Sequence, residues 1–200
     1  MAAFDLARVT HPGRVAWIGI GGNLGNALAH CRLAVARLTG RQDVRLLAMS
    51  GFYLTEPVGP VRGQPWYVNA VAVVETRCGP RALLGILMRI ERSLGRRRER
   101  EVRWGPRRID LDLLLHGDRI MNSPDLILPH PRLHRRRFVL LPMAALAPDL
   151  PHPRFAKTVD TLLRDVDDRG RVTPWPDTGI DLARNALAVT RFKWSGGRLG

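Results

Sequence analysis

Asp110 and Asp112 interrupt an apolar run over residues 109–116, IDLDLLLH. Because side chains alternate along a strand, we expect both carboxylates to project from one face while the leucines between them enter the core. Adjacent carboxylates repel one another unless a cation lies between them, and Mg²⁺ is commonly held by one or two carboxylates together with substrate phosphates. The pair therefore favours a magnesium site, although a solvated strand face with two ordinary aspartates has the same pattern.

An arginine-rich segment directly precedes the two aspartates. Residues 96–108 contain seven arginines and only two acidic residues, Glu99 and Glu101. Carboxylates, magnesium and arginines within reach of one another are the usual groups of phosphoryl transfer, where positioning and charge neutralisation supply most of the catalysis. The segment alone would more often be a solvated surface, so this interpretation depends on the adjacent aspartates. With many like charges and few apolar anchors, residues 96–104 are expected to form a lid that is ordered only when both substrates are bound.

Motifs of several other enzyme classes do not occur in the sequence. There is no GxxxxGK[ST] phosphate loop, and GGNLG at residues 21–25 lacks the full spacing of the dinucleotide fingerprint. Neither a GxSxG nucleophile elbow nor an HExxH zinc pair is present. Cys31 and Cys78 are too few for a disulfide framework or a zinc site.

The composition is that of a folded chain. At 45% hydrophobic and 25% charged, 200 residues are enough for a sizeable core and exclude wholesale disorder. No apolar run approaches the roughly 20 residues of a membrane span. Asp5 and Arg8 interrupt the N-terminal apolar stretch that a signal peptide would need. We therefore expect a cytoplasmic protein without a membrane segment.

The charge of the chain is dominated by arginine. Lys and Arg number 32 against 18 Asp and Glu, a net charge of +14, and only Lys157 and Lys193 are lysines. Guanidinium groups match phosphate oxygens better than ammonium groups do, so nucleotides or nucleic acids are expected partners. A GC-rich genome can produce the same excess on a surface, so the clustering of the arginines carries more weight than their number.

Hydrophobic periodicity and turn residues predict the order strand, helix, strand, strand, helix, strand. The predicted strands cover residues 15–20, 46–54, 67–76 and 109–116. The first predicted helix covers residues 27–39, and the second begins at Gly79-Pro80 and ends at Gly95. This order is typical of a ferredoxin-like α+β sandwich, βαββαβ, whose sheet is covered on one face by two helices.

The segments around this pattern are less regular. A short strand around residues 119–121 and a last helix over residues 138–146 are expected after the fourth strand. The domain should cover residues 15–154, between an N-terminal arm at residues 1–14 and a C-terminal extension of unknown role at residues 155–200. The elements predicted in this extension are a helical turn over residues 161–166 and a strand over residues 186–194.

Four motifs in chain order resemble those of one enzyme family. They are GGNLG, YVNAVA, RWGPRRIDLDLLL and LPHPRLHRRRFVL. From about residue 15 to residue 151 the chain is similar to 6-hydroxymethyl-7,8-dihydropterin pyrophosphokinases of folate biosynthesis, and the RWGPR-x-x-D-x-D signature is highly specific. The resemblance implies a ferredoxin-like α/β sandwich that transfers pyrophosphate from ATP to the hydroxymethyl group of the reduced pterin and releases AMP. Gly22 departs from the family pattern, which usually has serine there.

The resemblance also implies roles for individual residues. Asp110 and Asp112 would hold two Mg²⁺ ions bridging the ATP phosphates, and Arg96 and Arg98 would grip these phosphates during transfer. The residues implied in ATP binding are Glu91, Arg103, Trp104, Arg107, His130 and Arg136. The residues implied in pterin binding are Thr55, Val58, Tyr67, Asn69, Trp104 and Phe138. Tyr67 and Phe138 would stack on the ring, Asn69 would read its hydrogen-bonding edge, and Trp104 would close over the site.

Other interpretations of these residues remain open at this point. Tyr67 and Phe138 are more often core aromatics, His130 between two prolines is more often structural, and which of Arg97, Arg98 and Arg100 meets phosphate is undecided. A basic ferredoxin-like sheet without catalysis is also typical of RNA-binding modules. No RNP motif occurs, only 6% of residues are aromatic, and paired aspartates would repel RNA phosphates. We therefore expect ATP and the reduced pterin as partners, no specific nucleic acid, and a monomer.

Overall fold

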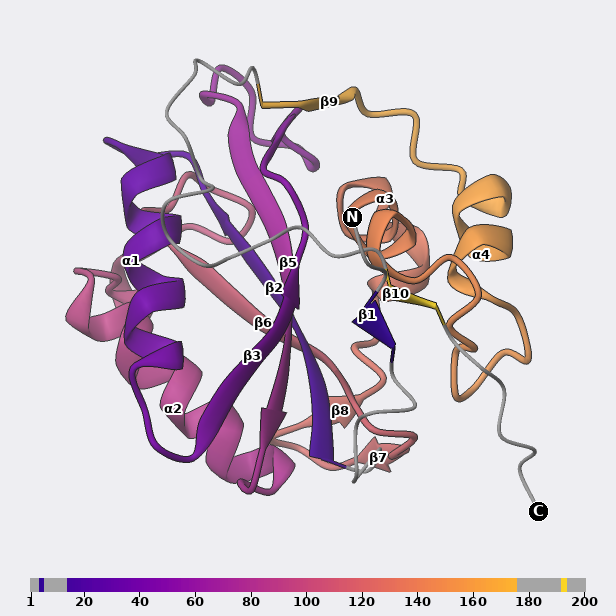
Figure 1. Cartoon of the computed structure of the whole chain (residues 1–200). Coiled ribbons are helices and arrows are strands. Elements are labelled where there is room, and N and C mark those ends of the chain that lie inside the picture. The colour runs from indigo at the N-terminus through magenta and orange to yellow at the C-terminus, as the bar shows by residue number, and fades with distance from the viewer. Residues whose placement is uncertain (1–3, 6–13, 176–191, 194–200) are drawn as a thin grey trace.

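An antiparallel sheet lies between two layers of helices (Figure 1). The computed structural model describes residues 4–5, 14–175 and 192–193. The strand order is β6-β2-β5-β4-β9, and β3 also pairs with β5. The strands of this sheet are β2 (Val15–Gly22), β3 (Val44–Met49), β4 (Tyr53–Thr55), β5 (Tyr67–Thr76), β6 (Asp110–His116) and β9 (Val172–Pro174). Two small sheets pair β1 (Phe4–Asp5) with β10 (Phe192–Lys193), and β7 (Met121–Asn122) with β8 (Ile127–Leu128).

The helices cover both faces of the sheet. Figure 1 shows α1 (Ala27–Thr39) and α2 (Pro80–Ser93) on one side, and α3 (Arg137–Leu146) and α4 (Val159–Asp165) on the other. The two helices expected on one face are α1 and α2, and α3 with α4 adds a second layer on the other face. Two 3₁₀ turns, η3 (Arg98–Arg100) and η4 (Leu133–Arg135), complete the helical elements of the described chain. None of the helices within the described residues is long and apolar enough to span a membrane.

Strand β5 shows why two helical layers are needed. Its side chains alternate between two separate cores, because Val68 and Val74 pack with α1 and α2 while Val71 and Val73 pack with α3 and α4. A strand buried on both faces has a nearly continuous apolar sequence, as YVNAVAVVET has. Asn69 is the exception in this run, and it lies beside the cavity described below.

The single strand predicted over residues 46–54 is split into β3 and β4. Ser50 lies at the break: its backbone N donates to Val71 O at 2.9 Å, and its hydroxyl accepts from Val71 N at 2.9 Å. A side-chain hydrogen bond thus replaces one bond between the strands. The predicted bounds of α1 and β5 are confirmed, and the helical turn expected over residues 161–166 is α4. Most of the strand predicted over residues 186–194 lies outside the described residues, apart from β10.

A tight loop between α3 and α4 buries His152. The ring is only 4% exposed and stacks on Phe155 with a centroid separation of 4.6 Å. Its Nε2 is buried and has no hydrogen-bond partner among the described residues. Burial, with a smaller contribution from the charges of His134 and Arg154, lowers the pKa of His152 to about 4.

We predict that mild acid weakens the fold through His152. Its pKa falls from 6.5 to about 4 on folding, so the unfolded chain binds the proton first. The stability that His152 contributes is complete above pH 6.5 and is lost as the pH falls towards 4. Between pH 7 and pH 5 the free energy of unfolding should fall by about 1–2 kcal/mol more in the wild type than in His152→Gln. Urea denaturation at each pH measures the difference, and equal losses would contradict the assignment.

Candidate active site

A cavity opens on the α3 side of the sheet, above two glycines of β2. Gly19 and Gly21 of β2 lie opposite Asp112 and Asp110 of β6. Gly21 also lies opposite Asn69 of β5, and a Cβ added to Gly21 would be 2.2 Å from Asn69 Oδ1. The two glycines therefore form a floor that leaves room for a ligand above the sheet.

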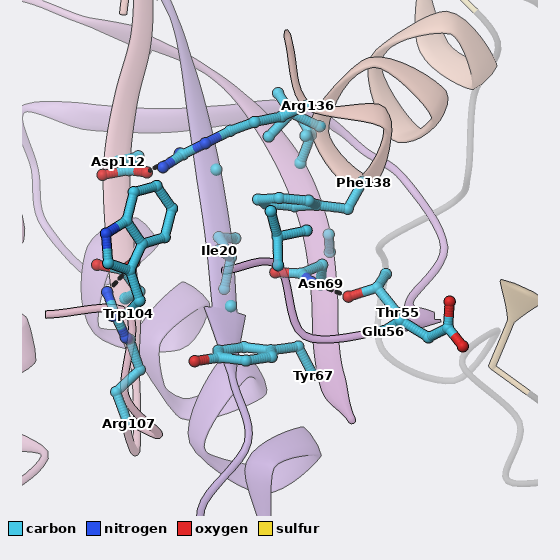
Figure 2. A pocket seen from close by; sticks show the side chains of 17 residues that line it. Ile20, Thr55, Glu56, Tyr67, Asn69, Trp104, Arg107, Asp112, Arg136 and Phe138 are labelled. Atoms are coloured by element: carbon cyan, nitrogen blue, oxygen red, sulfur yellow. Dashed lines mark hydrogen bonds and ion pairs between the residues drawn. The ribbon is translucent and has the colours of Figure 1, made fainter. Parts of the chain in front are cut away.

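The aromatic rings of Tyr67 and Phe138 lie on opposite sides of this cavity, with Asn69 between them (Figure 2). Asn69 is 7% exposed, and its Nδ2 donates to Thr55 Oγ1 at 2.6 Å. The Tyr67 hydroxyl donates to Gly105 O at 3.0 Å, which fixes the ring. Two apolar faces with a buried amide between them suit a flat heteroaromatic ring that presents hydrogen-bonding groups at its edge.

The carboxylates of Asp110 and Asp112 both reach the cavity, as the strand alternation predicted. Asp110 pairs with Arg96 and, at 2.9 Å, with Arg107, while Asp112 pairs with Arg136 at 3.1 Å. Burial raises the pKa of Asp110, but Arg96 and Arg107 outweigh this effect and hold that pKa below its ordinary value. Asp110 is therefore ionised at neutral pH, and Arg96 and Arg107 balance its charge.

The donor set at this point fits magnesium better than a metal that needs several protein ligands. The described residues contain no group of three or more His, Cys, Asp and Glu side chains placed to hold a metal. Mg²⁺ does not need such a group, because it binds through one or two carboxylates and completes its shell with water and phosphate oxygens. Asp110 and Asp112 would hold it here.

Arg96 is buried in a network of acidic groups behind Asp110. Its side chain is 5% exposed, and it bonds Glu91 Oε1 at 2.5 Å and Glu101 Oε2 at 3.0 Å, besides Asp110. Glu91 is 1% exposed, and it also accepts from Arg98 Nη2 at 2.7 Å and from Leu111 N at 2.8 Å. Burial raises the pKa of Glu91 against the opposing charge of Arg96.

These contacts correct one expectation about residues 96–104. The sequence suggested that little holds this segment in place, but ion pairs hold it at Arg96 and Arg98. At the other end of the segment, Trp104 has a left-handed backbone with φ 66°. The Arg132 guanidinium lies over its ring, 4.6 Å from the ring centroid. A Cβ added to Gly59 would be 3.1 Å from Trp104 Cβ, so this ring packs against the loop before β5.

Asn23 does not line the cavity but supports the loops around it, and the sequence analysis missed this role. It is 4% exposed, its Oδ1 accepts from Arg107 N at 2.8 Å, and its Nδ2 donates to Pro65 O at 3.0 Å. Asn23 therefore joins three loops around the cavity. The adjacent Gly22 is required by this close approach, because a Cβ there would be 2.4 Å from Arg108 O. The one polar side chain inside GGNLG was the signal available in the sequence.

A protein-family model described as 7,8-dihydro-6-hydroxymethylpterin-pyrophosphokinase (HPPK) matches residues 17–148. The chain belongs to the HPPK family.

Relatives with curated names are similar over most of the HPPK domain. The 2-amino-4-hydroxy-6-hydroxymethyldihydropteridine pyrophosphokinase of Synechocystis sp. is 38% identical over 150 residues, which are 75% of this chain and 75% of that protein. The protein of the same name from Haemophilus influenzae is 41% identical over 138 residues, 69% of this chain and 84% of that protein.

Solved structures of HPPK-DHPS proteins share the fold. A crystal structure of HPPK-DHPS in complex with substrates has a TM-score of 0.58 at 15% identity, over 75% of this chain and 43% of that chain. Plasmodium falciparum HPPK-DHPS wild type with SDX-DHP has a TM-score of 0.59 at 14% identity, over 75% and 44%. The chain thus spans less than half of these solved chains, and the likeness concerns the fold alone.

Most residues singled out from the HPPK motifs meet at the cavity. Those that line it are Thr55, Val58, Tyr67, Asn69, Trp104, Arg107, Asp110, Asp112, Arg136 and Phe138. Two more contact the aspartates: Arg96 bonds Asp110, and His130 Nε2 lies 3.7 Å from Asp112 Oδ2. Glu91 contacts Arg96, and Arg98 contacts Glu91. Arg103 lies outside the lining, with its guanidinium 5.8 Å from the Trp104 ring centroid.

We predict that Arg96 stabilises the fold as well as the site. Arg96→Ala leaves the buried carboxylate of Glu91 without its closest cation, so the free energy of unfolding should fall by roughly 2–4 kcal/mol. Arg98→Ala removes a half-exposed partner of the same carboxylate and should cost less than about 1 kcal/mol. Urea denaturation of both variants measures this, and equal losses would show that burial of Arg96 does not matter.

Proposed function

We propose that this chain transfers the pyrophosphoryl group of ATP to the hydroxymethyl group of 6-hydroxymethyl-7,8-dihydropterin and releases AMP, a step of folate biosynthesis. One observation carries the proposal: an aromatic slot above Asn69 and the Asp110–Asp112 pair with its arginines share a single cavity. The family and the names of the relatives support a pyrophosphokinase acting on a pteridine. The alternative of an RNA-binding module without catalysis is not favoured.

The pterin is proposed to lie between Tyr67 and Phe138. Their rings provide two stacking faces, and the buried pair of Asn69 and Thr55 provides hydrogen-bonding groups for the edge of the ring. Val58 and Trp104 line the same cavity and exclude water from the reacting end. Replacing solvent by fixed groups strengthens every charge interaction in the site.

The triphosphate is proposed to bind on the other side of the cavity. Asp110 and Asp112 would hold magnesium, two ions by the family resemblance, which neutralises charge on the phosphate oxygens. Arg107 and Arg136 each pair with one of these carboxylates and line the cavity, so each can exchange its carboxylate for a phosphate oxygen. In this proposal Glu91, Arg103, Trp104 and His130 complete the nucleotide side.

Arg96 and Arg98 are proposed to act during the transfer itself. The hydroxymethyl oxygen gives up its proton to solvent and forms a bond to the β-phosphorus, while the bond from that phosphorus to the oxygen shared with the α-phosphate breaks, so that AMP leaves with that oxygen. Arg96 already contacts Asp110, and it becomes free to bond a phosphate oxygen when that carboxylate is neutralised. Contacts formed mainly at this stage lower the barrier rather than strengthen ATP binding.

We infer that the sheet is of the ferredoxin-like type. The order β2, α1, β3 with β4, β5, α2, β6 follows the pattern βαββαβ, and β2 and β5 occupy the centre of the sheet. The division into an arm, a domain over residues 15–154 and an extension remains a prediction, as do the monomeric state and the cytoplasmic location.

We predict that Asp110→Asn and Asp112→Asn each lower AMP formation at least about 100-fold while the fold is retained, because each removes a charge that binds the metal. The assay contains ATP labelled in the β-phosphate, magnesium and the reduced pterin, and it follows AMP together with transfer of the label to the pterin. Asp160→Asn, on the surface of α4 with Arg164, is the control and should keep full activity. Near-full turnover of both site variants would refute the metal assignment, and label in ADP alone would refute pyrophosphoryl transfer.

A further inference from the structure

The loop over residues 56–66 joins β4 to β5 and forms part of the cavity wall. Val58 lines the cavity, and Gly59 packs against Trp104. Gln64 Nε2 donates to Trp104 O at 2.9 Å. The loop itself contains no helix or strand, and it has prolines at three positions and glycines at two. Its conformation therefore depends on contacts with other segments, both within the loop and at its two ends.

Arg171, from the segment just before β9, contacts both ends of this loop. At the first end, Arg171 N and Nε donate to the two carboxylate oxygens of Glu56, each at 2.8 Å. Glu56 N donates in return to Arg171 O at 3.0 Å. At the other end, the Arg171 guanidinium lies 4.9 Å from the centroid of the Trp66 ring.

The two ends are the direct neighbours of pterin-side residues. Thr55 precedes Glu56, Tyr67 follows Trp66, and Thr55 and Tyr67 are paired in the register of β4 and β5. Strand β9 pairs with the other side of β4, where Val172 lies opposite Thr55. Glu56 is itself one of the residues that line the cavity, but in Figure 2 its carboxylate points away from Tyr67 and Phe138.

We infer that Arg171 is a positioning residue for the pterin side of the cavity, acting through Glu56 and Trp66. This inference rests on the proposed function, and Arg171 lies beyond residues 17–148, which the family model matches. Arg171 does not line the cavity. Its loss should loosen the wall formed by Val58, Thr55 and Tyr67 and leave the carboxylates at the nucleotide side in place.

The contact is exposed, so it should affect the loop far more than the whole fold. The side chains of Arg171 and Glu56 are 70% and 31% exposed, and single exposed ion pairs contribute little to global stability. Hydrogen bonds from the Arg171 backbone and side chain hold the pKa of Glu56 below its ordinary value, so the contact persists at neutral pH.

Steady-state kinetics test the inference with Arg171→Ala and Glu56→Gln. Each variant should raise KM for the pterin about 3–10-fold and change kcat and KM for ATP less than about twofold, because ordering of one substrate's wall is lost. The double variant should resemble Arg171→Ala, since both substitutions remove the side-chain ion pair and only Arg171→Ala also removes the contact with Trp66. Arg164→Ala is the matched control, because this arginine is 71% exposed and has an ion pair with Asp160. An unchanged pterin KM, or equal changes for both substrates, would overturn the inference.

Limited trypsin digestion tests the same contact without relying on activity. The only arginine within residues 56–66 is Arg62, and cleavage after it requires local opening of the loop. The initial cleavage rate there, measured by mass spectrometry, should rise about 3–10-fold in Arg171→Ala and Glu56→Gln relative to the wild type and Arg164→Ala. Equal rates in all four proteins would overturn the inference. A wild-type chain that forms no AMP, but whose loop opens in these two variants, would refute the proposed function alone.

Discussion

The site depends on charge compensation around two carboxylates on one strand face. Asp110 and Asp112 repel one another, and their compensation comes from arginines on three different segments: Arg96 before η3, Arg107 after Trp104, and Arg136 before α3. The carboxylates thus draw these segments to one point of the sheet. Guanidinium groups suit phosphate oxygens, so in the proposed function the groups that compensate Asp110 and Asp112 also bind the nucleotide.

The second constraint is the division of one face of the sheet. Part of that face is closed by α3 and α4 over Val71 and Val73, where the side chains are apolar. The remainder stays open because Gly19 and Gly21 have no side chains. A heteroaromatic ring and a triphosphate can therefore lie side by side against a rigid strand floor, which holds reacting groups better than loops do.

Local patterns in the sequence predicted the parts of this arrangement that depend on periodicity. The alternation around Asp110 and Asp112 placed both carboxylates on one face, and the apolar run of β5 gave its bounds. Contacts between distant segments could not be predicted in this way. The burial of Arg96 depends on Glu91 from α2, the role of Asn23 depends on the loop at Arg107, and β9 joins the sheet through β4. None of these partners is recognisable from residue type or spacing.

The sharing of charges between the carboxylates and the substrate can be seen in a crystal structure with magnesium, a non-hydrolysable ATP analogue and the reduced pterin. We expect the pterin ring between Tyr67 and Phe138 and metal bonded to Asp110 and Asp112. Arg96 and Arg107 should have left Asp110 for phosphate oxygens. If Arg96 and Arg107 still pair with Asp110 while nucleotide and metal are bound elsewhere, these arginines do not serve both the carboxylates and the nucleotide.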